Sequence, residues 1–332
     1  MSMNEATEAE VGATLAQLDA LRAAIAQAIV GQQDVVEQLL IGLLAGGHCL
    51  LEGVPGLGKT LLVRTLGRAL ALDFRRVQFT PDLMPSDIIG TEILEEDHGT
   101  GRRSFQFQRG PVFTNLLLAD ELNRTPPKTQ AALLEAMQEH TVSYAGVTHR
   151  LPEPFFVLAT QNPIEQSGTY PLPEAQLDRF LLNIRVDYPD LGSERDILLQ
   201  TTGSRSPEVP VVMAAAEVIA LQRLVREVHL GDDLLDWILA MVRATRPGEG
   251  ADASIRRWVQ WGAGPRAGQA WVLAAKARAL LHRRLAATRE DIAALAAPVL
   301  RHRLLLGFMA EAEQKTSDEV IMALLERHPP PR

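Results

Sequence analysis

The sequence predicts an α/β domain of three layers, followed by a helical region. Five short apolar runs are nearly continuous rather than alternating, as in parallel strands that are buried on both faces. These runs occupy residues 48–53, 75–80, 115–120, 155–160 and 181–186. Amphipathic segments, such as residues 60–70 and 129–140, lie between them and have apolar residues three and four positions apart. Strands that alternate with helices indicate a sheet that helices cover on both faces.

Two segments interrupt this alternation, and we expect each to form a β-hairpin. Residues 91–110 contain the turn sequence HGTG between two β-prone stretches. Residues 140–155 contain the turn sequence AGV between similar flanks. Both hairpins would be insertions into the α/β domain.

Beyond residue 190 the sequence predicts no further strands. Alanine, leucine and arginine dominate there, and helical periodicity continues to about residue 327. We therefore expect an α/β domain over residues 1–190 and a helical lid over residues 191–332, with a loop at residues 205–212. The prolines of the terminal sequence HPPPR cannot continue a helix, so this tail is expected to be frayed.

Composition restricts the partners and the compartment. The 332 residues carry 33 Lys and Arg against 41 Asp and Glu, a net charge of −8, which disfavours a phosphate backbone as partner. The single cysteine, Cys49, cannot form an internal disulfide. The first residues lack the basic and apolar segments of a signal peptide, and no apolar run is long enough to span a bilayer. We expect a cytoplasmic protein without membrane insertion and without a nucleic-acid partner.

The sequence GVPGLGKT, at residues 53–60, matches the phosphate-loop pattern G-x-x-x-x-G-K-[ST]. It follows a predicted strand and opens a predicted helix, so backbone N–H groups and the helix N-terminus would bind phosphate. Lys59 would reach the β- and γ-phosphates of ATP, and the Thr60 hydroxyl would ligate Mg²⁺. The predicted nucleotide-binding residues of this segment are Gly53, Val54, Pro55, Gly56, Leu57, Gly58, Lys59, Thr60 and Leu61.

Polar side chains follow two other predicted strands. Asp120 and Glu121 end the run LLLADE, where Asp120 suits a Mg²⁺ shell and Glu121 could polarise a water in line with the γ-phosphate. Thr160, Gln161 and Asn162 end the next strand. Because the carboxyl ends of parallel strands meet at one crevice, an amide there could hold the attacking water.

These motifs, with Arg179 and the sequence GPRAG at residues 264–268, resemble the AAA+ ATPases and specifically the MoxR family. The runs LLADELNR, QAALLEAMQE, ATQNPIEQSGTYPLPEAQLDRF and VLRHRL are similar to runs of that family, and the resemblance covers roughly residues 28–310. It implies a P-loop (ASCE/AAA+) fold with a parallel five-stranded sheet in the order 5-1-4-3-2, hairpin inserts and a C-terminal α-helical lid. It also implies hexameric rings.

The resemblance assigns roles by position. It places Walker A on Lys59 and Thr60, Walker B on Asp120 and Glu121, sensor 1 on Asn162, the arginine finger on Arg179 and sensor 2 on Arg266. The sequence IVGQ resembles the segment that lines the adenine pocket, so Val30, Gly31 and Gln32 join the predicted nucleotide site.

Arg179 lies between the last two predicted strands, at the edge of the domain. From there it could not comfortably reach its own nucleotide, but in a ring it would face the γ-phosphate of the neighbouring subunit. The alternative is a surface salt bridge to Asp178 or Glu174. Two basic clusters, at residues 280–284 and 300–304, could face phosphate, an acidic partner or solvent, and we expect them to face solvent or another subunit.

The favoured function is an ATP-hydrolysing, ring-forming, chaperone-like enzyme that remodels a client protein. The resemblance suggests a partner with a von Willebrand factor A domain. One alternative is the motor subunit of a metal chelatase, which shares the inserts. Others are a nucleic-acid-dependent motor, against which the net charge argues, and a slowly hydrolysing scaffold, against which Glu121, Asn162 and Arg179 argue.

Overall fold

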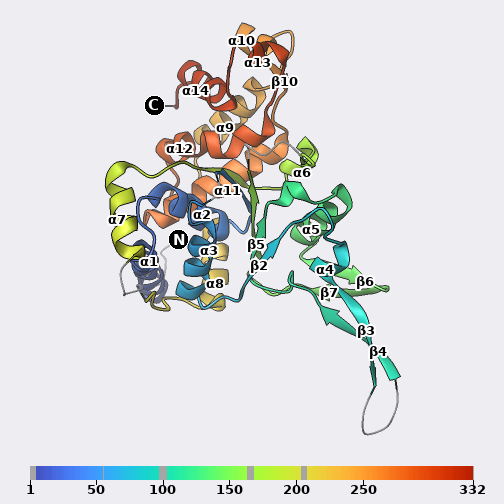
Figure 1. The fold of residues 1–332 in the computed structure, drawn as a ribbon. Helices are drawn as coiled ribbons and strands as arrows, with labels where there is room; N and C mark the ends of the chain where they lie inside the picture. Colours follow the sequence, from blue (N-terminus) through green and yellow to red (C-terminus); the bar gives the residue numbers. More distant parts are fainter. Residues whose placement is uncertain (1–4, 55, 97–102, 163–167, 203–207, 332) are drawn as a thin grey trace.

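The fold is built around a parallel sheet of five strands (Figure 1). The computed structural model describes residues 5–54, 56–96, 103–162, 168–202 and 208–331. In spatial order the strands of the sheet are β2 (Phe74–Gln78), β5 (Leu116–Asp120), β8 (Phe156–Gln161), β1 (Cys49–Gly53) and β9 (Leu182–Val186). Numbered along the chain, these five strands have the order 5-1-4-3-2, as predicted.

The edge strand β2 departs from the expectation that all five strands are buried on both faces. Arg75, Arg76 and Gln78 of this strand are exposed, whereas every residue from Leu116 to Ala119 of its neighbour β5 is buried. A strand with only one neighbour leaves its outer edge open, so polar side chains are tolerated there.

Helices cover both faces of the sheet and give the predicted three layers. Figure 1 shows α1 (Glu5–Ala26), α2 (Gln33–Leu44) and α3 (Lys59–Ala69) on one face, with α4 (Pro85–Ile89) and α5 (Pro127–Glu139) on the other. One apolar cluster joins the first group to alternate strand residues such as Leu118, and a second joins α5 to their neighbours such as Leu117. The two-residue period of the strands thus divides their side chains between two cores.

Both predicted hairpins are present. One pairs β3 (Gly90–Glu96) with β4 (Arg103–Arg109) and projects away from the sheet (Figure 1). The other pairs β6 (Thr141–Tyr144) with β7 (Val147–Arg150). The turn sequence at residues 98–101 lies outside the described residues.

Aromatic contacts join the two hairpins. The ring of Phe107 in β4 stacks on that of His149 in β7, with centroids 4.4 Å apart and planes 17° from parallel. Phe107 also contacts Tyr144 of β6 at 5.3 Å, and Phe113 meets both Phe107 and His149 edge-on. Such ring pairs add to the energy of their buried area, so the bases of the two hairpins are expected to move together.

The remainder of the chain is mostly helical. Its helices are α7 (Leu191–Thr201), α8 (Ala215–Glu227), α9 (Asp232–Ala244), α10 (Ala253–Trp258), α11 (Pro265–Leu281), α12 (Arg289–Leu300), η2 (Arg301–Arg303), α13 (Phe308–Ala312) and α14 (Ser317–Arg327). The last helix ends before the prolines at 329–331. Within the described ranges, no helix is long and apolar enough to cross a membrane.

The expectation that strands end near residue 190 is wrong. β10 (Val259–Trp261) pairs in antiparallel fashion with β11 (Leu305–Leu306). Strands of three and two residues are too short to show an alternating pattern, and their partners lie more than forty residues apart in the chain.

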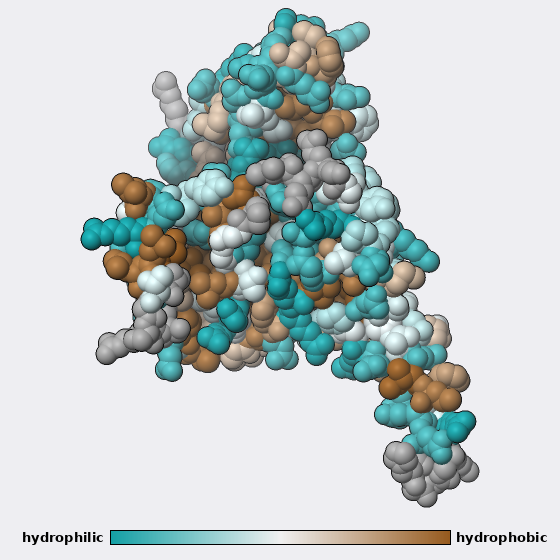
Figure 2. Space-filling model, in the orientation of Figure 1, coloured by the Kyte–Doolittle hydropathy of each residue, from teal (hydrophilic) through white to brown (hydrophobic). Residues whose placement is uncertain are grey.

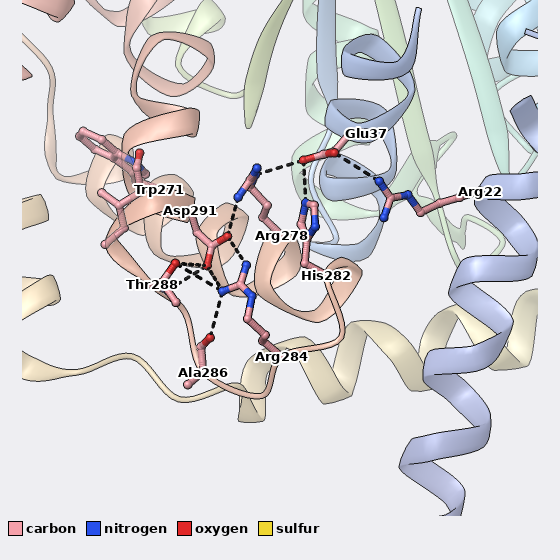
Figure 3. A network of polar contacts seen from close by, with 10 residues as sticks. Arg22, Glu37, Trp271, Arg278, His282, Arg284, Ala286, Thr288 and Asp291 are labelled. Carbon is pink, nitrogen blue, oxygen red and sulfur yellow. Dashed lines mark hydrogen bonds and ion pairs between the residues drawn. The ribbon is translucent and has the colours of Figure 1, made fainter. Parts of the chain in front are cut away.

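A network of charged side chains fastens the helical region to the α/β domain (Figure 3). Glu37 of α2 accepts hydrogen bonds from Arg278 and His282 of α11, each at 3.1 Å, and lies 3.6 Å from Arg22 of α1. Arg278 also binds the fully buried Asp291 of α12 at 2.7 Å. A buried carboxylate needs such partners, because an unpaired charge in the interior is costly.

The basic cluster at residues 280–284 therefore does not face solvent or another subunit as a group. His282 binds Glu37, and Arg284 binds Asp291 through two nitrogens at 2.6 and 2.7 Å. Burial acts to raise the pKa of Asp291, but hydrogen bonds from Arg284, Thr288 and Arg278 outweigh it and hold this pKa below its usual value. The cluster supplies the cations that this buried carboxylate requires.

The buried His48 predicts a loss of stability in mild acid. Its Nε2 donates to the Met137 carbonyl at 2.9 Å and its Nδ1 accepts from the Val157 N–H at 3.0 Å, so the ring is neutral. Burial lowers the pKa of His48 from 6.5 to about 4. Between these values the unfolded chain binds a proton that the native protein does not, so stability falls by about 3 kcal/mol as the pH drops.

This contribution is measurable by urea unfolding between pH 7 and pH 4. We expect the free energy of unfolding of His48→Gln to fall less steeply over this range than that of the parent, because the neutral amide can both donate and accept. Parallel pH profiles for the two proteins would contradict the assignment.

Candidate functional site

The phosphate loop joins the end of β1 to the start of α3. Gly56 and Gly58 have φ values of 89° and 72°, in the left-handed region that side chains disfavour. A Cβ on Gly53 would lie 2.5 Å from the carbonyl oxygen of Val186 in β9, so only glycine fits there. Pro55 lies outside the described residues. The loop places the first N–H groups of α3 toward a cavity at the carboxyl edge of the sheet.

This cavity has a volume of about 260 Å³. It is lined by Gly53, Gly56, Gly58, Lys59, Thr60, Arg76, Gln78, Asp120, Glu121, Thr160, Gln161 and Asn162. The structure thus brings together the phosphate loop, the acidic residues Asp120 and Glu121 at the end of β5 and the amide after β8. The carboxyl ends of strands β1, β5 and β8 converge on it, as expected for a ligand crevice in a parallel sheet.

The side chain of Lys59 bridges the two ends of the phosphate loop. Its ammonium donates to the Gly53 carbonyl at 2.5 Å. Burial lowers the pKa of Lys59, against the opposing effect of the Asp120 and Glu121 charges. The ammonium therefore lies in a partly desolvated place, where its attraction for a phosphate oxygen is stronger than in water.

Asp120 is held on both carboxylate oxygens. Oδ1 accepts from the Thr160 hydroxyl at 2.6 Å, and Oδ2 accepts from Nε and Nη2 of Arg76 at 3.0 and 2.6 Å. Thr60 lines the same cavity, so a hydroxyl and a carboxylate are available together. Oxygen donors of this kind fit Mg²⁺.

Glu121 follows Asp120 in a left-handed conformation, with φ 57°. Its N–H donates to the Thr160 hydroxyl at 2.9 Å, which fixes the turn. Its Oε2 accepts from Gln78 at 2.6 Å and lies 3.1 Å from Nε of Arg124. The carboxylate is therefore oriented by two side chains at the rim of the cavity.

Two residues of this site escaped the interpretation of the sequence, namely Arg76 and Gln78 of β2. The two residues are two positions apart in this edge strand, so their side chains lie on the same face of the sheet. From there Arg76 binds Asp120 and Gln78 binds Glu121. Their signal in the sequence is the pair of polar residues two positions apart within the run RRVQFT. That signal gains meaning only once β2 is known to lie beside β5.

Comparisons with known proteins agree with this architecture. Residues 48–182 match the model of the ATPase family associated with various cellular activities (AAA), and residues 252–324 match the AAA lid domain. The chain is 45% identical over 299 residues to Chaperone MoxR1 of Mycobacterium tuberculosis, covering 90% of this chain and 78% of the relative. The chain belongs to the MoxR family of AAA+ ATPases. It is therefore an ATPase that binds its nucleotide through a P-loop domain.

Other relatives match over similar lengths. The YeaC protein of Bacillus subtilis is 43% identical over 302 residues, 91% of each chain, and the MoxR protein of Paracoccus denitrificans is 32% identical over 323 residues, 92% of each. A crystal structure from Cytophaga hutchinsonii, described as that of a candidate ATPase, superposes with a TM-score of 0.92 at 39% identity over 99% of each chain.

Residues 30–32, which the family resemblance places at the adenine pocket, do not line this cavity. Gln32 instead donates to the Leu57 carbonyl at 3.0 Å and so holds the phosphate loop from outside. Gly31 has a φ of 73°, and a Cβ there would lie 2.4 Å from that of Ser193 in α7. Val30 is half-buried beside them. These residues connect the loop to the first helix after the sheet.

Arg179 and Arg266, which the MoxR resemblance assigned to catalysis, also lie outside this cavity. Arg266 is exposed in the first turn of α11. Arg179 follows α6 (Glu174–Leu177) and lines a separate hollow with Glu135 and Glu139 of α5.

Arg179 makes no ion pair with any carboxylate in the described part of the chain. Asp178, one of the two partners in the alternative interpretation, is bound instead to Arg303 at 2.7 Å. The alternative of a surface salt bridge from Arg179 to Asp178 or Glu174 is therefore wrong.

Proposed function

We propose that this MoxR ATPase is a ring-forming, chaperone-like enzyme in which each active centre is completed by the neighbouring subunit. One observation carries the proposal. The phosphate loop, the acidic residues and the amide that could bind and hydrolyse a triphosphate share a cavity, and Arg179 lies outside it. Arg179 is partly exposed and has no carboxylate partner among the residues that the structure describes. An arginine in that position is available to a nucleotide on another subunit.

In this proposal the residues of the cavity divide the chemistry. The phosphate loop and Lys59 bind the phosphates, and Glu121 accepts a proton from the water that attacks the γ-phosphorus. Asn162, only 8% exposed, orients that water. The bond from the γ-phosphorus to the bridging oxygen breaks, and ADP and phosphate leave. Arg179 and Arg266 would offer positive charge as the transition state develops.

Thr60 and Asp120 would hold Mg²⁺ in this proposal. The ion neutralises charge on the β- and γ-phosphates when bound. Arg76 already offers a positive charge to Asp120 at the same place, and its two hydrogen bonds to Oδ2 hold the orientation of the carboxylate.

An exposed apolar face supports the assembly of several subunits. Tyr188, Leu191, Leu198 and Leu199 on and before α7 are 75, 85, 58 and 64% exposed. Figure 2 shows hydrophobic side chains gathered over α7. Contiguous apolar surface of this kind marks protein interfaces.

The projecting hairpin supports contact with a client protein. Ile93, Leu94 and Phe105 of β3 and β4 are exposed by 37, 54 and 69%. Figure 2 shows hydrophobic side chains on the projecting hairpin. We propose that changes in the lid during hydrolysis are passed to a client through this hairpin. The relative in Mycobacterium tuberculosis is named a chaperone, and the family resemblance suggests a client with a von Willebrand factor A domain.

The proposal predicts that ATPase activity depends on assembly. The rate per subunit should rise steeply with protein concentration, because a lone subunit lacks the neighbour's arginine. The measurement is steady-state phosphate release over a dilution series, paired with light scattering to give the mass at each concentration. A rate per subunit that stays constant down to the monomer would contradict shared active centres.

A further inference from the structure

The second basic cluster of the lid is buried, contrary to the expectation that residues 300–304 face solvent or another subunit. His302 and Arg303 of η2 are only 8 and 7% exposed. Three consecutive side chains, Arg301 to Arg303, reach from the lid to the segment that enters β9. That segment contains Arg179.

Arg303 uses all five of its N–H groups, four toward residues 178–181 and one toward Val299 of α12. Nε binds Oδ1 of Asp178 at 2.7 Å, and Nη2 binds the carbonyls of Asp178 at 3.3 Å and Phe180 at 2.7 Å. Nη1 binds the carbonyls of Leu181 at 3.2 Å and Val299. A lysine could not reproduce this set, because it has three donors at a single point.

The two preceding residues extend the contact. His302 donates through Nε2 to the Phe180 carbonyl at 3.1 Å, and burial together with the charge of Arg303 holds the pKa of His302 well below its usual value. Arg301 binds the Asn183 carbonyl at 3.3 Å and Asp318 of α14 at 3.0 Å. Lid side chains thus bind the backbone on both sides of Arg179.

The same cluster is linked to the first turn of α11. η2 directly continues α12, which packs closely along α11. Arg266 lies at the start of α11. Burial lowers the pKa of Arg303, the Asp178 carboxylate opposes this, and the positive charge of Arg266 lowers it further. Gly264, which immediately precedes α11, also lines one hollow together with Asp178 and Arg303.

We propose that Arg303 is a positioning residue that couples the lid of one subunit to the arginine that this subunit offers to its neighbour. Because Arg303 of the lid is bound to Asp178, the turn at residues 178–181 moves together with the lid. A change in lid orientation over a subunit's own nucleotide then moves Arg179 at the neighbour's γ-phosphate. This inference rests on the proposed function, in which Arg179 acts between subunits.

A purely structural role makes a different prediction from a positioning role. If Arg303 only stabilises its own subunit, its loss lowers the melting temperature and impairs the active centre of the same subunit. If Arg303 positions Arg179, the impaired active centre is the neighbour's. A displacement of about 1 Å in a catalytic group can cost about 100-fold in rate.

The test begins with Arg303→Lys and Asp178→Asn assayed alone. We expect kcat to fall about 10- to 100-fold in each, with the Kd for ATP unchanged. Asp178→Asn keeps the main-chain carbonyl contacts and serves if Arg303→Lys does not fold. The matched control is Arg257→Lys, which alters an exposed arginine paired with Glu313 in the lid and should leave kcat unchanged. An unchanged kcat in both Arg303→Lys and Asp178→Asn would overturn the inference.

The decisive step mixes each variant with an excess of Glu121→Gln subunits, which have an intact Arg179 and a disabled base. In the mixed rings each Arg303→Lys or Asp178→Asn subunit has Glu121→Gln neighbours, which supply a correctly placed Arg179. The hydrolysis rate per active centre that retains Glu121 should therefore recover for Arg303→Lys and Asp178→Asn. Arg179→Ala, mixed in the same way, reports on the shared centre itself. Recovery for Arg179→Ala without recovery for the other two overturns this inference alone, whereas no recovery for Arg179→Ala overturns the proposed function.

Discussion

Arg179→Ala lowers kcat for ATP hydrolysis by about 10³- to 10⁵-fold and leaves the Kd for ATP unchanged. The size of the effect follows from the role of an arginine that stabilises charge on the transferring phosphoryl group only in the transition state. The binding cavity does not contain Arg179, so its loss should not weaken nucleotide binding. Single-turnover hydrolysis and equilibrium binding with a fluorescent ATP analogue measure the two quantities separately.

The control for this variant is Arg185→Ala. Arg185 is an exposed arginine of β9 itself, and it is paired with Asp318 at 2.9 Å. We expect Arg185→Ala to retain the parental kcat. A parental rate in Arg179→Ala, or a loss of ATP binding, would show that Arg179 has another role.

Glu121→Gln should slow hydrolysis by about 10²- to 10⁴-fold while ATP remains bound. The amide has the shape of the carboxylate and can still accept a hydrogen bond from Gln78, but it cannot take the proton of the attacking water. The variant should therefore accumulate as an ATP-loaded assembly. Quenched-flow measurement of ADP formation gives the rate, and retention of radiolabelled ATP on a size-exclusion column gives the loading.

Lys59→Ala is the companion of this variant. It removes the ammonium of the phosphate loop, so binding itself should be lost, and the pair separates binding from chemistry. If Glu121→Gln hydrolyses ATP at the parental rate, Glu121 is not the general base. Gln78→Ala is informative beside it, since it frees the carboxylate from one of its two orienting partners.

Local signals account for the parts of the fold that the sequence predicted well. The phosphate loop, its strand and its helix occupy consecutive residues, so GVPGLGKT specifies them together. In β1, β5, β8 and β9 consecutive residues are buried, so each of these strands appears in the sequence as a continuous apolar run. The strand order came from the family resemblance, since no local pattern determines which strands lie side by side.

Features that depend on distant contacts were missed. The sequence RHR consists of three basic residues and suggests an exposed surface. His302 and Arg303 are nevertheless buried, because carbonyl groups about 120 residues away in the sequence accept their hydrogen bonds. Arg76 and Gln78 gained their role only because β2 pairs with β5. The pairing of β10 with β11 was missed for the same reason. In each case the partner that satisfies the group is remote in the sequence.

The central claim is that each active centre belongs to two subunits. Its most direct measurement is a cryo-EM structure of the Glu121→Gln assembly with ATP and Mg²⁺. We expect the Arg179 guanidinium at hydrogen-bond distance, about 3 Å, from the γ-phosphate bound by the adjoining subunit. A closed assembly in which Arg179 faces solvent at every occupied interface would contradict the claim.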